Sequence, residues 1–382
     1  MRVLLLHNRY RQAGGEERAV ELQAAAFERA GIEHRVLERE SGEASRSRAA
    51  RAMLRGGERP EDVAQAVRDF GADIVHVHNL HPLFGHRSLA AARDAGAAVV
   101  VHLHNYRLFC SIAIAFRDGE QCFRCRGRRT LPGFVLNCRG SLPESAVYTT
   151  ALALHQPALL EAVDRFITPS HFAAGQLERL GLPRERVDVV ASYVPEAPPA
   201  AHDGGYALVA GRLSVEKGVA TAIEAAAISG VPLEVAGDGP LADDLRARAR
   251  GAPVEFLGRV PRERLDDLLA NAAMALVPSV SADVMPYAAL EAIAAGVPVI
   301  GSDAGSLPEV LGEERCVPRR DARALAAAMR RLLEDPAERE AEGRRLRERA
   351  REQFGEERYL RELLATYDAA QAGLRGSITA ST

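Results

Sequence analysis

The chain has 382 residues, of which 47% are hydrophobic and 26% charged, and its formal net charge is −3 at pH 7. That length exceeds what one hydrophobic core usually organises, so we expect two domains. The near-neutral charge argues against nucleic acid as a partner. No stretch reaches the roughly 18 uninterrupted apolar residues of a membrane-spanning helix. We therefore expect a globular protein of the cytoplasm.

The first half of the chain predicts short buried strands separated by helices. Its opening apolar run, Val3–Leu6, is too short for a signal peptide and suits a first strand. Further strands are predicted at Arg35–Leu37, Asp73–His78, Val99–His104, Arg165–Thr168 and Val187–Ala191, and helices at Glu16–Ala30 and Ser88–Ala95. We assign residues 1–195 to an N-terminal Rossmann-like domain.

The second half repeats this alternation. Its predicted strands are Tyr206–Ala210, Leu233–Ala236, Val254–Leu257, Met274–Pro278 and Val299–Gly301. A Pro- and Gly-rich linker at Pro195–Gly205 precedes a second Rossmann-like domain at residues 203–353, and we expect the helical segment 354–382 to pack back on the N-terminal domain. The predicted fold is α/β, with two doubly wound parallel sheets facing a central cleft. Ligands of such sheets bind at the C-terminal ends of the strands.

A first motif with chemical content is Gly211–Gly218, which reads Gly-Arg-Leu-Ser-Val-Glu-Lys-Gly after a predicted strand. Lys217 is the only lysine in a chain with 49 Lys and Arg residues. A compact ammonium at this place suggests a site that an arginine would not serve equally well. We expect Arg212 and Lys217 to converge on a diphosphate beside a helix N-terminus. The alternative is an ordinary loop with incidental surface cations.

A second motif runs from Val277 through a polar loop into a helix that is expected to start near Tyr287. Asp283 and Glu291 flank this loop-to-helix turn. Carboxylates accept pairs of hydrogen bonds, which suits the vicinal hydroxyls of a sugar or ribose. Taken alone, the pair could also be a helix cap and a surface glutamate.

With both motifs the chain resembles glycosyltransferase family 4, retaining enzymes of the GT-B fold, over nearly its whole length. The runs Val235–Pro240 and Phe256–Val260 add to the resemblance. It implies that Arg212 and Lys217 hold the donor diphosphate. It further implies the remaining donor contacts: Asp283 to the transferred sugar, Glu291 to the ribose, backbone near Val260 to the base, and Met285, Tyr287 and Ala288 along the second motif.

The resemblance also implies the reaction. A hexose-type sugar moves from a UDP-, GDP- or dTDP-linked donor to a hydroxyl of a glycan, a lipid-linked or a small-molecule acceptor. No cofactor is required for catalysis, and the leaving diphosphate itself helps to deprotonate the acceptor. Two positions depart from the family pattern: Asp283 stands where a Glu is usual, and Pro286 where many members have Gly.

In the N-terminal half, Gly14 and Gly15 follow the first strand and let backbone approach a ligand closely. By the resemblance this loop faces the donor diphosphate and the acceptor. Several histidines gather at two strand ends: His76, His78, His81, His102 and His104. The resemblance places His104 near the reacting sugar, as a substrate contact and not as a nucleophile. For the others we prefer lining of the substrate cleft to a zinc site.

Four of the five cysteines form a C-x11-C-x2-C-x12-C pattern at Cys110, Cys122, Cys125 and Cys138. This spacing predicts a structural zinc in an insertion at residues 110–138 that is too polar to form a core of its own. Unliganded thiols and a disulfide or redox pair are the alternatives. We expect Cys316 to be a buried thiol without such a role.

Two other classes of function were weighed. A nicotinamide-dependent dehydrogenase needs a G-x-G-x-x-G turn, and the sequence from Gly237 fails it because Ala242 occupies the third glycine position. A non-catalytic binder of sugar nucleotides, or a scaffold of the same fold, stays open because Asp283 replaces the usual Glu.

The Arg-rich stretch from Arg46 to Arg55 also suits peripheral contact with an anionic membrane.

Overall fold

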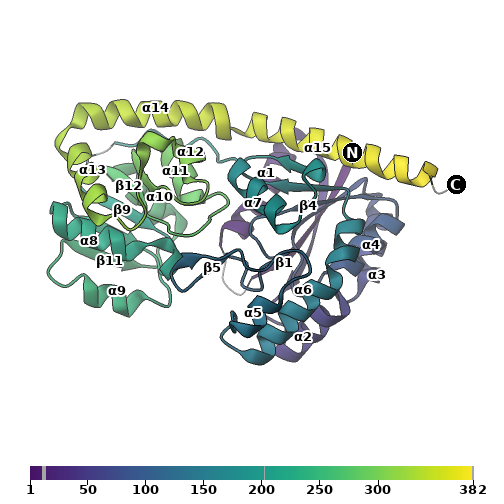
Figure 1. Ribbon diagram of the computed structural model, residues 1–382. Coiled ribbons are helices and arrows are strands. Elements are labelled where there is room, and N and C mark those ends of the chain that lie inside the picture. Colours follow the sequence, from purple (N-terminus) through teal and green to yellow (C-terminus); the bar gives the residue numbers. More distant parts are fainter. Residues whose placement is uncertain (11–13, 202, 381–382) are drawn as a thin grey trace. The chain divides into compact units, whose positions relative to one another are not determined.

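The structure is a computed structural model that describes residues 1–10, 14–201 and 203–380 (Figure 1). The chain divides into two compact units. Unit 1 comprises Met1–Ala115, Cys122–Ser192 and the described residues from Tyr359 onward, and unit 2 comprises Phe116–Gln121 and Tyr193–Arg358.

Unit 1 is built on a parallel sheet of six strands in the order β2-β1-β3-β4-β7-β8. The strands are β1 (Arg2–Arg9), β2 (Glu33–Glu40), β3 (Ile74–Asn79), β4 (Ala98–His102), β7 (Arg165–Thr168) and β8 (Val187–Val189). The central strands β3 and β4 are buried at every position. Continuous apolar runs of this kind are typical of parallel strands covered on both faces.

Helices connect these strands and cover the sheet. They are α1 (Gly15–Ala30), α2 (Arg46–Arg55), α3 (Pro60–Phe70), α4 (His86–Asp94), α5 (Leu131–Val135), α6 (Leu142–Ala162) and α7 (His171–Leu180). Side-chain oxygens of Ser45 and Ser170 accept hydrogen bonds from the first turns of α2 and α7, which fixes where these helices begin.

The last helix, α15 (Glu356–Ala380), contributes buried aromatic residues to unit 1. The hydroxyl of Tyr367 lies 2.6 Å from Nδ1 of His76 on β3 and accepts a 3.0 Å hydrogen bond from Nε2 of Gln23 on α1. Tyr359 donates from its hydroxyl to the other end of the Gln23 amide at 2.9 Å. The C-terminal helix is therefore part of this core, through polar bonds as well as burial.

Unit 2 has its own parallel six-stranded sheet, in the order β11-β10-β9-β12-β13-β14. Its strands are β9 (Ala207–Ala210), β10 (Leu233–Ala236), β11 (Val254–Gly258), β12 (Met274–Val277), β13 (Val299–Ser302) and β14 (Cys316–Val317). Counted from its first strand, this is the Rossmann order 3-2-1-4-5-6, whose direction reverses between β9 and β12. The ligand site of a Rossmann sheet lies at that reversal.

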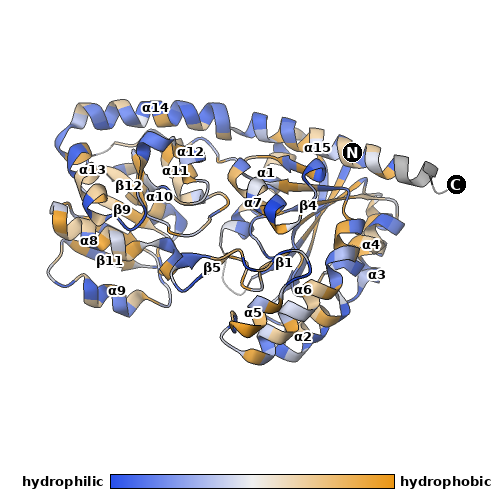
Figure 2. Ribbon diagram, viewed as in Figure 1, coloured by the Kyte–Doolittle hydropathy of each residue, from blue (hydrophilic) through white to orange (hydrophobic). Residues whose placement is uncertain are grey.

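The helices of unit 2 are α8 (Val219–Ser229), α9 (Ala242–Arg248), α10 (Arg262–Asn271), α11 (Tyr287–Ala295), α12 (Leu307–Leu311), α13 (Ala322–Glu334) and α14 (Pro336–Phe354). Figure 2 shows their apolar residues toward the sheet and charged residues outward, most clearly along α14. No helix among the described residues is long and apolar enough to cross a bilayer.

The predicted strands of both halves are present, with differences at their ends. β4 stops at His102, two residues before the predicted end, because His104 already lies in the loop that follows. The hairpin β5 (Phe116–Arg117) and β6 (Glu120–Gln121) and the short strand β14 were not predicted. Two-residue strands leave no periodic pattern in a sequence. Cys316 was expected to be buried and is only half-buried, because it lies on the edge strand β14.

Candidate functional site

The two motifs of the second half meet where the strand order of unit 2 reverses. β9 leads into Gly211–Gly218 and β12 leads into Pro278–Ser281, and β9 and β12 are paired neighbours. Gly218 has a φ of +66°, and a Cβ there would lie 1.9 Å from the carbonyl oxygen of Pro278. Only glycine permits this approach of the two loops. The Val280 amide then donates to the Glu216 carbonyl at 2.9 Å and ties the loops together.

Lys217 and Asp283, one from each motif, form an ion pair. The Nζ of Lys217 donates to Oδ2 of Asp283 at 2.8 Å, with side chains 33% and 18% exposed. Ser279 and Ser281 each donate a hydroxyl to the same carboxylate at 3.0 Å. Burial raises the pKa of Asp283, but Lys217 and the two hydroxyls outweigh it, so that pKa lies below its ordinary value. The Asp283 carboxyl group is therefore ionised at neutral pH, beside the Lys217 side chain at the end of the sheet.

Arg212 is held by a carboxylate that sequence reasoning did not single out. Its Nη2 lies 3.1 Å from Oε1 of Glu216, which also accepts a 2.6 Å hydrogen bond from the hydroxyl of Ser214. Glu216 is buried, whereas the Arg212 side chain is 55% exposed. Glu216 therefore orients an arginine whose other N–H groups remain accessible for an anion. In the sequence, this role of Glu216 was indicated by its position between Ser214 and Lys217.

Glu291 lies in the second turn of α11 and pairs with Arg262 at the start of α10, with Oε1 and Nη1 2.5 Å apart. The Glu291 side chain is 12% exposed. Burial lowers the pKa of Arg262, but Glu291 and Asp266 raise it more, so that pKa lies above its ordinary value. Sequence reasoning missed Arg262, because the contact joins residues far apart in the chain.

The other donor residues predicted in this half lie around the same sheet end. Tyr287 and Ala288 are the first two residues of α11, at the positive end of the helix dipole. Met285 is buried just before this start, and Val260 follows the end of β11. The structure thus brings Lys217 into contact with Asp283 and arranges the remaining predicted residues on the loops of one sheet.

In unit 1 the predicted Gly14–Gly15 loop is fixed by the carboxylate of Glu17. That carboxylate accepts from the Gly14 amide at 2.8 Å and from the Tyr10 amide at 3.0 Å. Its neighbour Glu16 accepts hydrogen bonds from the Tyr10 hydroxyl at 3.2 Å and from the side-chain amide of Asn105. The loop after β1 is thereby joined to the loop after β4, which begins with His104.

Glu16 has an altered acidity. Burial raises its pKa to about 7, against the opposing effects of Arg107 and the hydrogen bonds from Tyr10 and Asn105. A carboxyl group that changes its charge near neutral pH beside this loop was not foreseen, because the sequence does not show that Glu16 faces Arg107 and Asn105.

The imidazole ring of His104 stacks against other histidine rings of unit 1. Its Nε2 is 2.8 Å from Nδ1 of His78, and its ring stacks on His102 with centroids 4.0 Å apart. Burial lowers the pKa of His104 to about 3, so the ring is neutral. A neutral imidazole offers a hydrogen bond to a hydroxyl and carries no charge, which fits substrate contact.

The ring nitrogens of His76, His78 and His102 approach within 4.8 Å of one another. Such a group is a candidate for a metal, but two of its ring pairs are stacked, His76 on His78 at 22° and His78 on His102 at 28°, while His76 and His102 are tilted by 50°. An imidazole binds a metal through a lone pair in the ring plane, and stacked rings direct these lone pairs side by side instead of toward one point. The arrangement therefore disfavours metal binding.

Three of the predicted zinc ligands, Cys110, Cys122 and Cys138, lie near the fourth, Cys125, but among the described residues no three of these thiols lie within 4.8 Å of one another. No disulfide joins the five cysteines of the chain. A Cβ at Gly133 would lie 3.2 Å from the hydroxyl of Ser111 and 3.8 Å from Sγ of Cys125, so this glycine brings the Cys110 loop close to Cys125. Burial raises the pKa of Cys125 to about 11, and the nearby thiols of Cys110, Cys138 and Cys122 raise it further.

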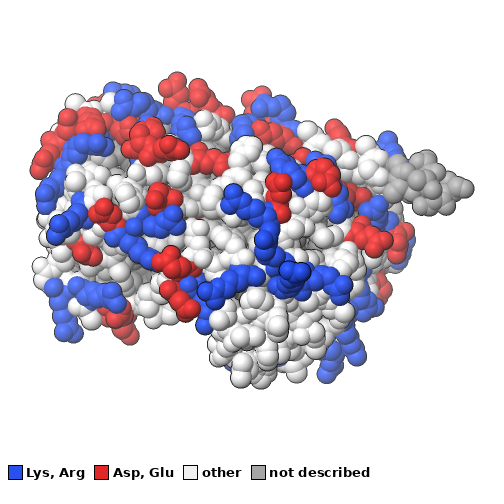
Figure 3. Space-filling model, in the orientation of Figure 1, with Lys and Arg blue, Asp and Glu red and all other residues white. Residues whose placement is uncertain are grey.

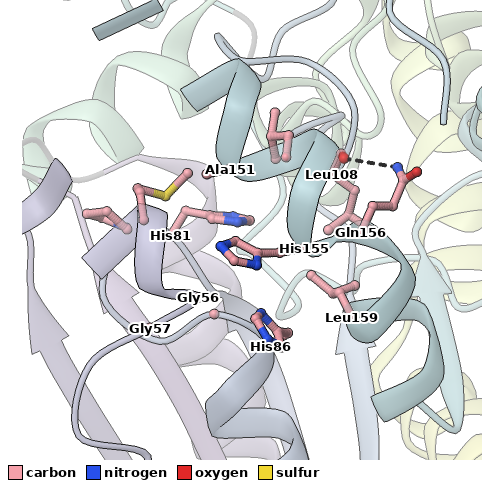
Figure 4. Close-up of a pocket in the computed structure, with 13 residues that line it drawn as sticks. Gly56, Gly57, His81, His86, Leu108, Ala151, His155, Gln156 and Leu159 are labelled. Atoms are coloured by element: carbon pink, nitrogen blue, oxygen red, sulfur yellow. Dashed lines mark hydrogen bonds between the residues drawn. The ribbon is translucent and has the colours of Figure 1, made fainter. Parts of the chain in front are cut away.

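A pocket lies inside unit 1 between α2, α6 and the loop that contains the cis His81–Pro82 bond (Figure 4). It encloses about 400 Å³, including space open to solvent, and its lining is mostly apolar. His86 and His155 stack across it with centroids 4.6 Å apart, and burial lowers the pKa of His81 to about 3. Its mostly apolar lining does not suit a charged diphosphate.

Both halves of the chain match known families. Residues 14–192 match the family described as "Glycosyl transferase 4-like domain", and residues 195–353 match "Glycosyl transferases group 1". Together with the two parallel α/β sheets, these matches define a glycosyltransferase of the GT-B fold. The chain belongs to glycosyltransferase family 4.

Individual relatives agree with this assignment. A GDP-mannose-dependent phosphatidylinositol dimannoside mannosyltransferase of Mycobacterium tuberculosis is 35% identical over 180 residues, 45% of this chain and 46% of that protein. The matched region thus spans about half the length of this curated relative. Among solved structures, HepE of Anabaena in complex with UDP superimposes with a TM-score of 0.65 at 16% identity, covering 97% of this chain and 100% of that one. Sucrose-phosphate synthase of Thermosynechococcus elongatus does so with a TM-score of 0.67 at 20% identity, over the whole of both chains. At such identities these structures establish the fold alone.

Proposed function

We propose that the protein is a cytoplasmic, retaining glycosyltransferase that moves a hexose-type sugar from a nucleoside-diphosphate sugar to an acceptor hydroxyl. The observation that carries this proposal is the ion pair between Lys217 and Asp283 at the reversal of the unit 2 sheet. It puts the only lysine of the chain, on the first motif, beside the acid of the second. A loop cation next to a sugar-binding carboxylate is what a donor with a diphosphate on one side and a sugar on the other requires.

Arg212 and Lys217 would bind the diphosphate and stabilise the charge that develops when it leaves. Both already point from the sheet end, oriented by Glu216 and Asp283. Preorganised cations of this kind need no rearrangement during the reaction, and loss of one such contact costs about 100-fold or more in rate. The enzyme supplies position and electrostatics, and the leaving diphosphate takes the acceptor proton.

The nucleoside would occupy the neighbouring loops. Glu291, positioned by its ion pair with Arg262, would accept hydrogen bonds from the ribose hydroxyls, and backbone near Val260 would meet the base. The first N–H groups of α11, at Tyr287 and Ala288, and the backbone at Met285 are placed for donor oxygens. The acceptor side would come from His104 and from the Gly14–Gly15 loop.

For the substrates we propose chemical classes and not particular molecules. The mannosyltransferase relative is named for GDP-mannose, and HepE binds UDP. We therefore propose a UDP-, GDP- or dTDP-linked donor, with a glycan, a lipid-linked or a small-molecule acceptor. The second candidate, a non-catalytic binder of the same ligands, rests on Asp283 in place of the usual Glu.

Turnover of isotope-labelled donor sugar separates the two candidates. An enzyme releases labelled sugar to an acceptor, or slowly to water, at a rate that Lys217→Ala abolishes. Binding of the nucleotide without any such release identifies the non-catalytic binder. NMR of the anomeric carbon in the product then tests retention of configuration.

We propose in addition that the cysteine cluster of Cys110, Cys122, Cys125 and Cys138 holds a structural zinc. Thiols bind the metal as thiolates, so zinc would tie the four half-buried cysteines together in a segment rich in Gly and Arg. Elemental analysis of the gently purified protein should give one zinc per chain. Cys125→Ser should lose it and Cys316→Ser should keep it, whereas well under one metal per chain in the unaltered protein contradicts the proposal.

A further inference from the structure

The exposed apolar side chains concentrate on three helices of unit 1, namely α2, α5 and α6. α2 and α5 each pack against α6. Of the ten large hydrophobic residues that are exposed among those described, six lie on these helices: Leu54, Leu131, Phe134, Val135, Leu142 and Leu154. Single exposed apolar residues are ordinary, but a group on adjoining helices marks an interaction site. We call the surface of these six residues the α2–α5–α6 face.

The helix α6 shows why this surface is unusual. Apolar residues occupy almost all of its sides, a pattern that normally belongs to a helix buried all round. Its inner side is buried, with Leu152 and Leu159 at 5% exposure, while Leu154 on the other side is 56% exposed. The pocket of Figure 4 is lined from within by Leu152 and by Met53, the neighbour of exposed Leu54. The core of unit 1 therefore continues outward into an uncovered apolar surface.

The charges around this face are mostly positive, although Glu144 pairs with Arg46 and Arg139, and Glu58 pairs with Arg48. The segment 121–143, which contains α5, has no Asp or Glu and carries five arginines: Arg124, Arg126, Arg128, Arg129 and Arg139. α2 has no acidic residue either, and carries Arg46, Arg48, Arg51 and Arg55. Within the described part of the chain, no acidic side chain pairs with Arg51, Arg55 or Arg129. Figure 3 shows the uncharged surface over α5 and α6 with Lys and Arg side chains along its border.

We propose that the α2–α5–α6 face docks the protein on the surface of an anionic lipid bilayer. The six apolar residues would enter the boundary between headgroups and acyl chains, and the arginines would contact the headgroups. A second copy of the chain is a poorer occupant, because a twofold contact would bring the two sets of unpaired arginines against each other. This inference goes beyond the proposed function and does not rest on it.

Cosedimentation of the full chain with lipid vesicles, without nucleotide, tests the docking. We expect binding to vesicles that contain phosphatidylglycerol and at least tenfold weaker binding to phosphatidylcholine alone. Each lipid-facing arginine contributes about fivefold to such binding, so Arg51→Gln and Arg55→Gln should each weaken it by about that factor at low salt. Raising the salt from 0.1 to 1 M shortens the screening length from about 10 to 3 Å and should release most of the protein.

Matched variants distinguish a role of the α2–α5–α6 face in vesicle binding from a general effect of changing surface residues. Leu131→Gln and Val135→Gln should weaken vesicle binding several-fold, whereas Ile228→Gln and Arg250→Gln, exposed in unit 2, should leave it unchanged. Unfolding midpoints should be alike in all variants, because every altered side chain is exposed. Equal binding by all variants, no binding to anionic vesicles, or loss of a dimer in these variants in the absence of lipid would each overturn the proposal.

Discussion

The Nζ of Lys217 lies 2.8 Å from Oδ2 of Asp283, although 66 positions separate the two residues in the chain. The contact exists because Gly218 lets the loop after β9 touch the loop after β12. A cation meant for a diphosphate and an acid meant for a sugar thus share one hydrogen bond before any ligand arrives. Lys217 lowers the pKa of Asp283 and so keeps that carboxyl group ionised at neutral pH, and this ion pair is the basis of the predictions for the donor site.

Asp283→Asn should slow sugar transfer about 10- to 100-fold, because a hydrogen bond to a charged group contributes about 1.5–3 kcal/mol. The amide keeps the shape of the side chain but loses the charge. Binding of the nucleoside diphosphate alone should be retained, since that ligand lacks the transferred sugar that Asp283 is proposed to contact. Asp303→Asn, an exposed acid elsewhere in unit 2, serves as the control. Transfer at the unaltered rate would remove Asp283 from the sugar site.

Glu291→Gln should raise the donor KM about tenfold or more and leave kcat nearly unchanged. The ribose is bound equally in the ground state and the transition state, so loss of its contact affects binding and not the chemical step. Steady-state kinetics over a range of donor concentrations gives both values. Asp266→Asn removes the other acidic partner of Arg262 and should leave both constants close to normal. A fall in kcat with unchanged KM would assign Glu291 a different role.

Glu16 should make unit 1 less stable as the pH rises through the range from about 4.5 to 7. Its pKa is raised to about 7 in the folded protein, so the folded state holds the proton more tightly than the unfolded chain does. The contribution is fully present below pH 4.5 and is lost as the pH approaches 7 and above. Glu16→Gln cannot titrate, so its unfolding midpoint, compared with the unaltered protein between pH 5 and 8, should show a weaker decline. Parallel pH curves for the two proteins would contradict the assigned acidity.

Tyr367→Phe should destabilise unit 1 by about 1–3 kcal/mol, because it leaves Nδ1 of His76 and the amide of Gln23 without their shared hydroxyl partner. For a unit of this size, about 2–4 °C is lost per kcal/mol. Hydrogen exchange should increase along α15 and at the end of β3. Tyr148→Phe, where the ring keeps its contact with Arg139, should show neither change. An unaltered midpoint in Tyr367→Phe would mean that these bonds do not hold the C-terminal helix.

The sequence was sufficient for the alternating strands and helices, because buried runs such as Ala98–His102 are continuous and largely apolar. The motif residues Lys217 and Asp283 could also be identified, since a lone lysine and a loop-to-helix acid stand out locally. The partners of the other two motif residues, Arg212 and Glu291, could not be identified from the sequence. Glu216 and Arg262 look like ordinary surface charges until the sheet brings them to Arg212 and Glu291.

The same limit applies to surfaces. Arginines of α2 were visible in the sequence as a basic stretch, but the exposed leucines of α5 and α6 were indistinguishable from core residues. Only the packing of α2 and α5 on α6 shows which apolar side chains are left uncovered. The two-residue strands of the hairpin at Phe116–Gln121 carried no periodic signal at all.

The most direct test is thermal unfolding with UDP, GDP, dTDP and ADP at millimolar concentration, on the unaltered protein and on Lys217→Ala. A nucleotide present at 100 times its Kd stabilises the folded protein by about 2.7 kcal/mol, which is visible as a raised midpoint. We predict that one nucleotide raises the midpoint of the unaltered protein and has little effect on Lys217→Ala, which would locate the diphosphate at Lys217 and identify the donor base. If no nucleotide shifts either protein, or if the shift persists in Lys217→Ala, the donor site is not where the Lys217–Asp283 pair places it.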